Sequence, residues 1–360
     1  MVKETTSPDQ PKMPDQPKMT DSFDSLAGLI ASGQDLSAEQ MKAAIGQIMT
    51  GACGEGPMGL FLTALSAKGE TVAELAGAAA AMRANMTPII SRHEKLLDTC
   101  GTGGGGSTTF NISTTAALVI AAAGVPVAKH GNRSVTSRSG SADVLAGLGV
   151  NIGANVAQVE RCLNELGICF CFAPLMHPAM KYVSAVRKQL GIRTIFNLLG
   201  PLANPAAAQY QLLGVGRPET RPLIASALRL LGTERSFVVS GKDGLGEVTL
   251  AGTTLGTEVT PTGEREFAWE PEDFGIPRAP LDAINISGPE ESVELVRAVL
   301  AGELGPARDI VLLNAAAGLL VVGQADHPRD AAAVAAQSLD SGAAADLLEK
   351  LIRLSHEPAA

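Results

Sequence analysis

Short apolar runs that alternate with longer helical patterns constrain the fold of this chain more than any other feature. The apolar runs have the length and composition of buried strands, and they fall at residues 95–100, 125–129, 168–173 and 236–240. Helical patterns separate or follow them, at residues 115–123, 142–148, 310–322 and 331–354, with a further helix start near Pro289. Alternating strands and helices predict an α/β domain with a mostly parallel sheet flanked by helices.

The residues before this pattern are different in character. Residues 1–20 carry the sequence PDQPKM twice, and their prolines disfavour helix while offering little apolar surface to a core. We expect this stretch to be a disordered tail. Residues 21–90 have helical periodicity, which predicts a small all-helical domain.

Local signals refine this domain organisation. Ser37 with Gln40, and Thr71 with Glu74, have the spacing of capping boxes at two helix starts. Residues 177–204 interrupt the later alternation with Pro, Lys and Arg, and we interpret them as a helical insertion that returns to the first domain. The α/β domain then consists of residues 91–176 and 205–360.

Composition limits the partners and the location. The formal net charge is −9 and the chain has no run of basic residues, so a nucleic-acid partner is not expected. No stretch is long and apolar enough to suggest a membrane span or a secretory signal. The odd number of cysteines, five, favours reduced thiols over a disulfide framework. We therefore expect a cytoplasmic protein.

The strongest local motif is the glycine-rich stretch GTGGGG that begins at Gly101, directly after an expected strand. Glycines let backbone N–H groups approach a ligand, and the helix start that follows adds unpaired N–H groups and a partial positive charge. Hydroxyls at Thr109, Ser113 and Thr114 can donate to phosphate oxygens. The order of strand, glycines, hydroxyls and helix predicts an anion site. A flexible loop before a capped helix is the alternative.

A second strand–loop–helix unit follows with the sequence KHGNR, residues 129–133. Lys129 and Arg133 supply positive charge, Gly131 permits close approach, and Ser141 stands at the next helix start. Two units of this kind predict two anion-binding edges that face one ligand, such as a diphosphate. The alternative is a solvated basic turn with ordinary helix caps.

A third stretch, residues 177–205, places Arg187, Lys188 and Arg193 on a helical segment that ends in Gly-Pro and Asn-Pro turns. By itself it indicates only a charged surface helix with a turn. Its order after GTGG, NIST, KHGNR and SGSAD is more specific, because it continues with RKQLGIRTIFNLLGPLANP.

With these motifs in this order, the chain resembles the anthranilate phosphoribosyltransferase family from about residue 21 onwards. The resemblance implies a nucleoside phosphorylase/phosphoribosyltransferase-like fold, a hinged cleft between the two domains and a homodimer built on the helical domains. It also implies Mg²⁺ and a pentosyl transfer in tryptophan biosynthesis. Phosphoribosyl pyrophosphate and anthranilate would give N-(5-phosphoribosyl)anthranilate and pyrophosphate.

The resemblance also assigns roles to residues. Gly101, Asn132 and Arg187 would contact anthranilate, and Ser113 and Glu247 would be the protein ligands of Mg²⁺. The contacts to phosphoribosyl pyrophosphate would come from the two glycine-containing units: Gly101, Gly104, Gly105, Thr109, Asn111, Ile112, Ser113, Thr114, Lys129, His130, Gly131, Asn132, Arg133, Ser137 and Ser141. No residue is assigned as a catalytic acid, base or nucleophile, because positioning and electrostatics suffice for this displacement.

The chain departs from the family pattern at two positions. Gly105 stands where the family usually has Asp, and Gly246 replaces the Asp of the usual Asp-Glu pair before Glu247. Both changes remove carboxylates from the metal neighbourhood, so we expect at least one Mg²⁺ position to be weakened or absent. Asp243 could substitute, although an aspartate in a turn is the more ordinary interpretation.

Two other functions fit parts of the sequence. A pyrimidine nucleoside phosphorylase shares the architecture and a phosphate-binding glycine loop, but it needs a nucleobase site where this chain carries the Arg187 segment. A non-catalytic binding relative would explain the missing carboxylates at positions 105 and 246. The net charge argues against a nucleic-acid-binding relative.

Overall fold

The computed structural model describes residues 22–103, 108–134 and 137–358. The expected tail at residues 1–20 and the site candidates Gly104 and Gly105 lie outside the described residues. Within the described ranges, no helix combines the length and the apolar character that crossing a bilayer requires.

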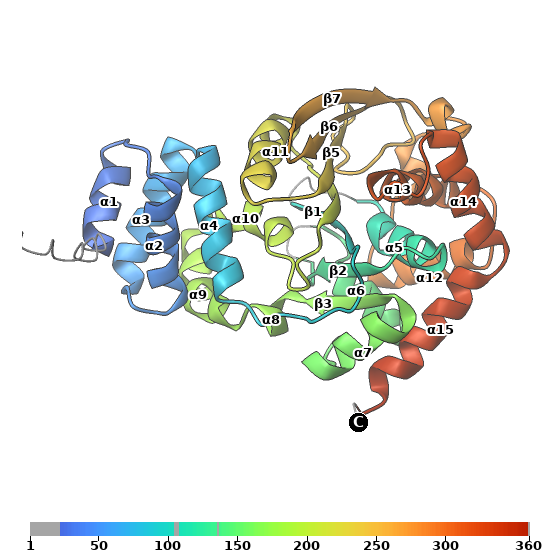
Figure 1. Ribbon diagram of the computed structural model, residues 1–360, viewed down its shortest axis with the longest axis horizontal. Helices are drawn as coiled ribbons and strands as arrows, with labels where there is room; N and C mark the ends of the chain where they lie inside the picture. Colours follow the sequence, from blue (N-terminus) through green and yellow to red (C-terminus); the bar gives the residue numbers. More distant parts are fainter. Residues whose placement is uncertain (1–21, 104–107, 135–136, 359–360) are drawn as a thin grey trace, which may run out of the picture.

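Four helices form a bundle at the N-terminal end, on the left of Figure 1. Both predicted capping boxes are present, because the Ser37 and Thr71 side chains accept from the backbone at Gln40 and Glu74. The buried apolar faces meet around Phe61, whose ring lies 5.4 Å from that of Phe23. The helices are α1 (Phe23–Ala31), α2 (Ala38–Met49), α3 (Glu55–Lys68) and α4 (Val72–Ala84).

The remainder is built on one seven-stranded sheet in the order β3-β2-β1-β4-β5-β6-β7. The first five strands in this order are parallel, and β6 and β7 form an antiparallel hairpin at one edge. This architecture confirms the predicted fold class. The strands are β1 (Leu97–Gly101), β2 (Val127–Gly131), β3 (Ile168–Phe172), β4 (Tyr210–Gly214), β5 (Arg235–Gly241), β6 (Thr254–Thr260) and β7 (Gly263–Trp269).

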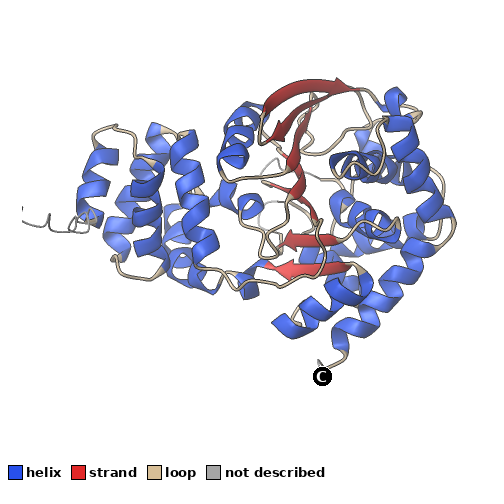
Figure 2. Cartoon of the chain, viewed as in Figure 1, coloured by secondary structure: helices blue, strands red, loops and turns tan. Residues whose placement is uncertain are grey.

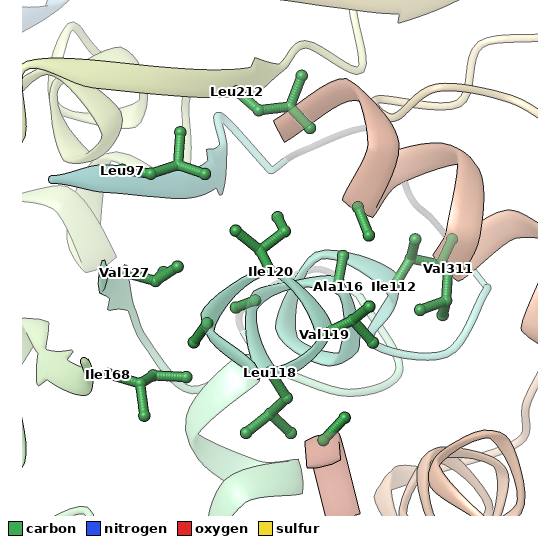
Figure 3. Packing of buried hydrophobic residues seen from close by; sticks show 14 of the residues in the cluster. Leu97, Ile112, Ala116, Leu118, Val119, Ile120, Val127, Ile168, Leu212 and Val311 are labelled. Atoms are coloured by element: carbon green, nitrogen blue, oxygen red, sulfur yellow. The ribbon is translucent and has the colours of Figure 1, made fainter. Parts of the chain in front are cut away.

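Helices cover both faces of this sheet (Figure 2). On one face, Ile120 of α5 packs among strand residues such as Leu97 and Val127, with Val311 of α13 close to the helix (Figure 3). On the other face, α11 packs against β5 and β6 and against α4 of the bundle. The helices of the sheet region, apart from those between β3 and β4, are α5 (Ile112–Ala122), α6 (Ser141–Leu148), α7 (Val156–Leu166), α11 (Arg221–Leu230), α12 (Pro289–Leu300), α13 (Pro306–Val321), α14 (Pro328–Asp340) and α15 (Ala343–His356), with 3₁₀ turns η3 (Pro218–Thr220), η4 (Pro271–Phe274) and η5 (Leu281–Ile284).

The segment between β3 and β4 returns to the bundle. Its long helix α9 (Lys181–Leu190) lies against α2 and α3, and Val183 and Val186 are buried among bundle residues. Shorter turns flank α9 on both sides: α8 (Ala173–Met176), η1 (Pro178–Met180), α10 (Phe196–Leu199) and η2 (Gly200–Leu202).

Two local expectations were wrong. The single helix expected over residues 331–354 is two helices, because Gly342 adopts a left-handed conformation with φ 78° between α14 and α15. The first two strands begin and end later than expected, so that Gly101 closes β1 and the KHGNR motif begins inside β2. Lys129, His130 and Gly131 are therefore strand residues with fixed side-chain directions, rather than loop residues.

Candidate active site

The candidate site lies at the carboxyl ends of the parallel strands, where the strand order reverses. The chain runs from β1 through β2 to β3 on one side, and then from β4 to β5 on the other. In open α/β sheets, ligands bind in the crevice beyond such a switch point. Gly101 of β1 pairs there with Gly214 of β4.

Three glycine backbones approach one another closely at this switch point. A Cβ atom added to Gly101 would lie 3.1 Å from the carbonyl oxygen of Gly214, and one added to Gly214 would lie 1.7 Å from that of Gly246. A Cβ at Gly246 would lie 2.9 Å from the backbone nitrogen of Gly216. Only glycine fits at position 214 without a backbone shift. Because Gly214 has no side chain, the loop before Glu247 can lie directly against the end of β4.

The start of α5 carries the hydroxyls predicted to bind phosphate. Asn111 precedes the helix, Ile112 is its first residue, and Ser113 and Thr114 follow in its first turn. Ser292 of α12 fixes Asn111 by donating to its Oδ1 at 2.8 Å and accepting from its backbone nitrogen at 3.1 Å. The Thr114 hydroxyl is buried without a hydrogen-bond partner in the described part of the chain.

Lys129 connects the two predicted anion-binding units. It is a buried residue of β2, and its Nζ donates to the Thr99 carbonyl of β1 and to the Ser113 hydroxyl at 3.3 Å. Thr99 in turn donates through Oγ1 to the Ser113 carbonyl at 3.0 Å. The structure therefore brings together Lys129 and Ser113, which the sequence placed on separate units. Burial lowers the pKa of Lys129, while the nearby Asp98 and Glu247 carboxylates act in the opposite direction.

The loop after β2 returns to the start of α6. Ser141, the first residue of α6, donates through Oγ to the Asn132 carbonyl at 3.3 Å. Gly131 is packed tightly beneath this contact, because a Cβ there would lie 2.1 Å from Ser141 Oγ. Arg133 forms an ion pair with Asp143 at 2.8 Å, and Ser137 donates to the Ser139 carbonyl at 3.1 Å.

A hydrogen bond also joins the two loops, because Asn111 donates from Nδ2 to the Ser139 carbonyl at 3.4 Å. Thr109 instead forms an isolated β-bridge with Asn285, which follows η5. The predicted phosphate-binding residues in the described ranges thus lie on two adjacent strand ends and the helix starts that follow them.

Arg187 comes from a different part of the molecule. It lies on α9, where Nη2 donates to Asn197 Oδ1 at 3.3 Å and the guanidinium lies 5.8 Å from the centre of the Phe196 ring. Burial lowers the pKa of Arg187. Both of these contacts lie within the segment between β3 and β4, so local neighbours in that segment orient the guanidinium.

The donor set for a cation is small. Glu247 is partly buried, and burial raises the pKa of its carboxyl to about 7 despite the nearby Lys129. Asp243 is held in a turn, since Oδ1 accepts from Leu245 at 3.0 Å and Oδ2 accepts from Thr249. Within the described ranges no three His, Cys, Asp or Glu side chains form a group suited to a metal. Ser113 and Glu247 alone suit Mg²⁺ only if phosphate oxygens and water supply the other ligands.

Sequence reasoning assigned no role to several residues that hold this site. Asp98 of β1 accepts from the His130 backbone at 3.1 Å and from Asn204 Nδ2 at 2.8 Å, and both Asp98 and Asn204 are buried. His177 forms a hydrogen bond with His130. These polar residues lie in apolar sequence surroundings, and no spacing rule would have paired them.

Two family models match this chain, one over the helical bundle and one over the sheet region. A model of the glycosyl transferase family helical bundle domain matches residues 26–86, and a model of the glycosyl transferase family a/b domain matches residues 93–345. The anthranilate phosphoribosyltransferase of Rhodopirellula baltica is 49% identical over 330 residues, covering 92% of this chain and 96% of that protein. That of Trichlorobacter lovleyi is 49% identical over 337 residues, covering 90% and 97%.

Solved structures agree with these relatives. The crystal structure of anthranilate phosphoribosyltransferase from Thermus thermophilus has a TM-score of 0.88 and 42% identity, covering 92% of this chain and 99% of that one. The enzyme from Saccharomyces cerevisiae in complex with PRPP and Mg has a TM-score of 0.85 and 30% identity, covering 92% and 97%. Sequence identity at this level over nearly the full length of both compared proteins means that this chain belongs to the anthranilate phosphoribosyltransferase family.

Proposed function

We propose that this protein transfers the phosphoribosyl group of phosphoribosyl pyrophosphate to the amine of anthranilate in tryptophan biosynthesis. The observation that carries the proposal is the Lys129–Ser113 hydrogen bond of 3.3 Å, which links the two units predicted to bind anions. The curated relatives are named for this reaction, which favours it over a nucleoside phosphorylase or a non-catalytic relative.

Phosphoribosyl pyrophosphate would lie across the ends of β1 and β2. We assign its contacts to the backbone of Gly101 and to the loop that includes Gly104 and Gly105, and to the start of α5. Backbone N–H groups at a helix start carry partial positive charge, which suits a diphosphate. The remaining assigned contacts come from the described part of both units: Thr109, Asn111, Ile112, Ser113, Thr114, Lys129, His130, Gly131, Asn132, Arg133, Ser137 and Ser141.

Anthranilate would be held by Gly101, Asn132 and Arg187. A guanidinium offers paired N–H donors to a carboxylate, so Arg187 would orient the substrate through its acid group. The amine then attacks the anomeric carbon, the bond from that carbon to the pyrophosphate oxygen breaks, and the nitrogen loses a proton to solvent water. An aryl amine is unprotonated at neutral pH, so no protein base is required. Positioning of the amine and stabilisation of the leaving charge by Lys129 supply the catalysis.

We also propose that Mg²⁺ takes part, with Ser113 and Glu247 as its protein ligands. The yeast relative was solved with PRPP and Mg. When bound, the ion would neutralise charge on the pyrophosphate oxygens. Gly105 and Gly246 leave few carboxylates near the site, so we expect this enzyme to need more Mg²⁺ than a relative with acidic residues at those positions.

A homodimer in the cytoplasm completes the proposal. Leu60 on α3 is 75% exposed and lies in a groove that Gly56, Gly59, Val186 and Leu190 also line, between α3 and α9. A second copy would cover this apolar groove. All five cysteines are free, as expected where thiols stay reduced.

We divide the chain into a helical domain of residues 21–90 with 177–204 and an α/β domain of residues 91–176 with 205–360.

Loss of anthranilate fluorescence in the presence of phosphoribosyl pyrophosphate tests the reaction. We expect turnover that rises with Mg²⁺ concentration over a wide range. No turnover at any Mg²⁺ concentration would rule out the proposed function. Release of thymine from thymidine and phosphate, measured on the same preparation, would instead support the nucleoside phosphorylase.

A further inference from the structure

A pair of buried histidines joins the phosphate-binding strand to the segment that carries Arg187. His130 of β2 is 6% exposed and His177, just before η1, is 1% exposed. Their Nε2 atoms lie 3.1 Å apart although the residues are separated by 47 positions in sequence. A hydrogen bond between two histidine rings requires one ring to donate and the other to accept.

The backbone near His130 indicates which of the two rings donates. His130 Nδ1 lies 2.9 Å from the Gly200 carbonyl oxygen. A carbonyl oxygen can only accept, so His130 carries its proton on Nδ1. In the neutral ring Nε2 must then accept, and His177 donates to it from Nε2. Burial lowers the pKa of His130 to about 3 and that of His177 to about 4, although the Ala203 backbone acts in the opposite direction on His177, and both rings are neutral at pH 7. Nδ1 of His177 has no hydrogen-bond partner in the described part of the chain, consistent with a proton on its Nε2.

The pair therefore holds both ends of one segment. His177 stands at the beginning of residues 177–204, and Gly200 lies near their end. Asn204 adds a third connection, donating to the Asp98 carboxylate and to the Ala128 carbonyl, each at 2.8 Å. Arg187 and its partner Asn197 lie between these anchor points.

We infer that His177 is a positioning residue for anthranilate: by donating to His130 it fixes the Arg187 segment relative to the strand end that carries Asn132. This inference rests on the proposed function, because two of the three proposed anthranilate contacts, Asn132 and Arg187, lie on the two elements that the histidines join. The phosphoribosyl pyrophosphate contacts lie on β1, β2 and the helices that follow them. His130 is one of these contacts, but the register of β2 and its backbone hydrogen bond to Asp98 hold it in place without His177. These contacts therefore depend less on the histidine pair.

The test compares KM values for the two substrates in four enzymes at saturating Mg²⁺. His177→Phe keeps the ring but removes the donor, and we expect its anthranilate KM to rise about tenfold, as for a lost hydrogen bond with a buried partner. Its KM for phosphoribosyl pyrophosphate should change by less than about threefold. His177→Gln places an amide N–H near the Nε2 position and should restore the anthranilate KM to near the wild-type value. Ser184→Ala on the exposed side of α9 is the control and should change neither constant.

Equal rises in both KM values, or no rise in either, would overturn the inference. So would His177→Gln behaving like His177→Phe. If His177→Phe fails to fold, His177→Asn replaces it, because the shorter amide cannot reach His130; unaltered KM values in that variant would then contradict the inference.

Ring tautomers give a readout that does not depend on turnover. A ¹⁵N spectrum of the imidazoles at neutral pH should show one buried histidine protonated at Nδ1 and one at Nε2. Two Nε2-protonated rings would exclude the pair. Failure of wild-type turnover alongside the expected spectrum would reject the proposed function, whereas normal wild-type turnover with an unchanged His177→Phe would reject only the positioning role.

Discussion

The histidine pair should make the stability of the enzyme sensitive to mild acid. Both rings are buried and neutral in the fold, with the pKa of His130 lowered to about 3 and that of His177 to about 4. Burial is the main cause, and the Lys129 cation further opposes protonation of His130. In the unfolded chain each histidine regains a pKa of about 6.5.

Proton uptake by the unfolded chain sets the direction in which stability changes with pH. As pH falls below about 6.5, the unfolded chain binds protons that the folded chain refuses, so stability present at neutral pH is lost progressively towards pH 4. Between pH 7 and pH 5, each histidine then costs roughly 2 kcal/mol of unfolding free energy. Glu247, whose pKa burial raises to about 7, acts in the opposite direction over the same range. Comparing the wild type with a variant at position 177 cancels the contribution of Glu247, because both proteins carry it.

The measurement is urea unfolding of the wild type and of His177→Phe at both pH values. The single tryptophan, Trp269, packs against Phe237, Phe267 and Phe274, so its fluorescence reports on the sheet region. The variant should be less stable at neutral pH but should lose about 2 kcal/mol less than the wild type between pH 7 and pH 5. Identical losses in the two proteins would refute the assignment of a buried neutral ring at position 177.

Three further outcomes are expected. Arg187→Ala should raise the KM for anthranilate between about tenfold and a hundredfold, with a much smaller effect on phosphoribosyl pyrophosphate, whereas Lys188→Ala on the exposed side of α9 should change neither. Gly246→Asp should destabilise the protein by about 1–3 kcal/mol rather than restore metal affinity, because its Cβ would lie 2.9 Å from a backbone nitrogen. Chemical unfolding and Mg²⁺ titration measure the two effects. Gly252→Asp is the control, because a Cβ at position 252 would meet no atom within 4 Å. Leu60→Glu should convert the proposed dimer to a monomer in light scattering without unfolding it, and an unchanged mass would show that the groove is not the interface.

The sequence predicted the fold class, the family and the reaction because the motifs lie at strand ends in an order that few chains share. It did not predict β4 or the β6–β7 hairpin. Gln211 interrupts the short apolar run of β4, and its buried side chain donates to the Pro201 carbonyl at 2.7 Å and to Cys100 Sγ at 3.8 Å. β7 is an edge strand whose charged residues face solvent, so its pattern lacks the apolar run of a central strand.

The site was harder to predict than the fold. Ser113 and Lys129 were each identified from local motifs, but their hydrogen bond depends on the register of β1 and β2. The close packing of Gly214 against Gly246 depends on two backbones that are distant in sequence, so no local signal reveals it. Gly246 was interpreted only as a lost carboxylate, whereas it is also a position without room for one.

The return of α9 to the N-terminal bundle has a consequence for any attempt to study that bundle in isolation. Val183 and Val186 cover apolar residues of α2 and α3, yet they are encoded about a hundred positions downstream. A polypeptide that stops after α4 would leave that side uncovered, and we expect it to aggregate during expression. Adding back a peptide that spans α9 should restore its solubility.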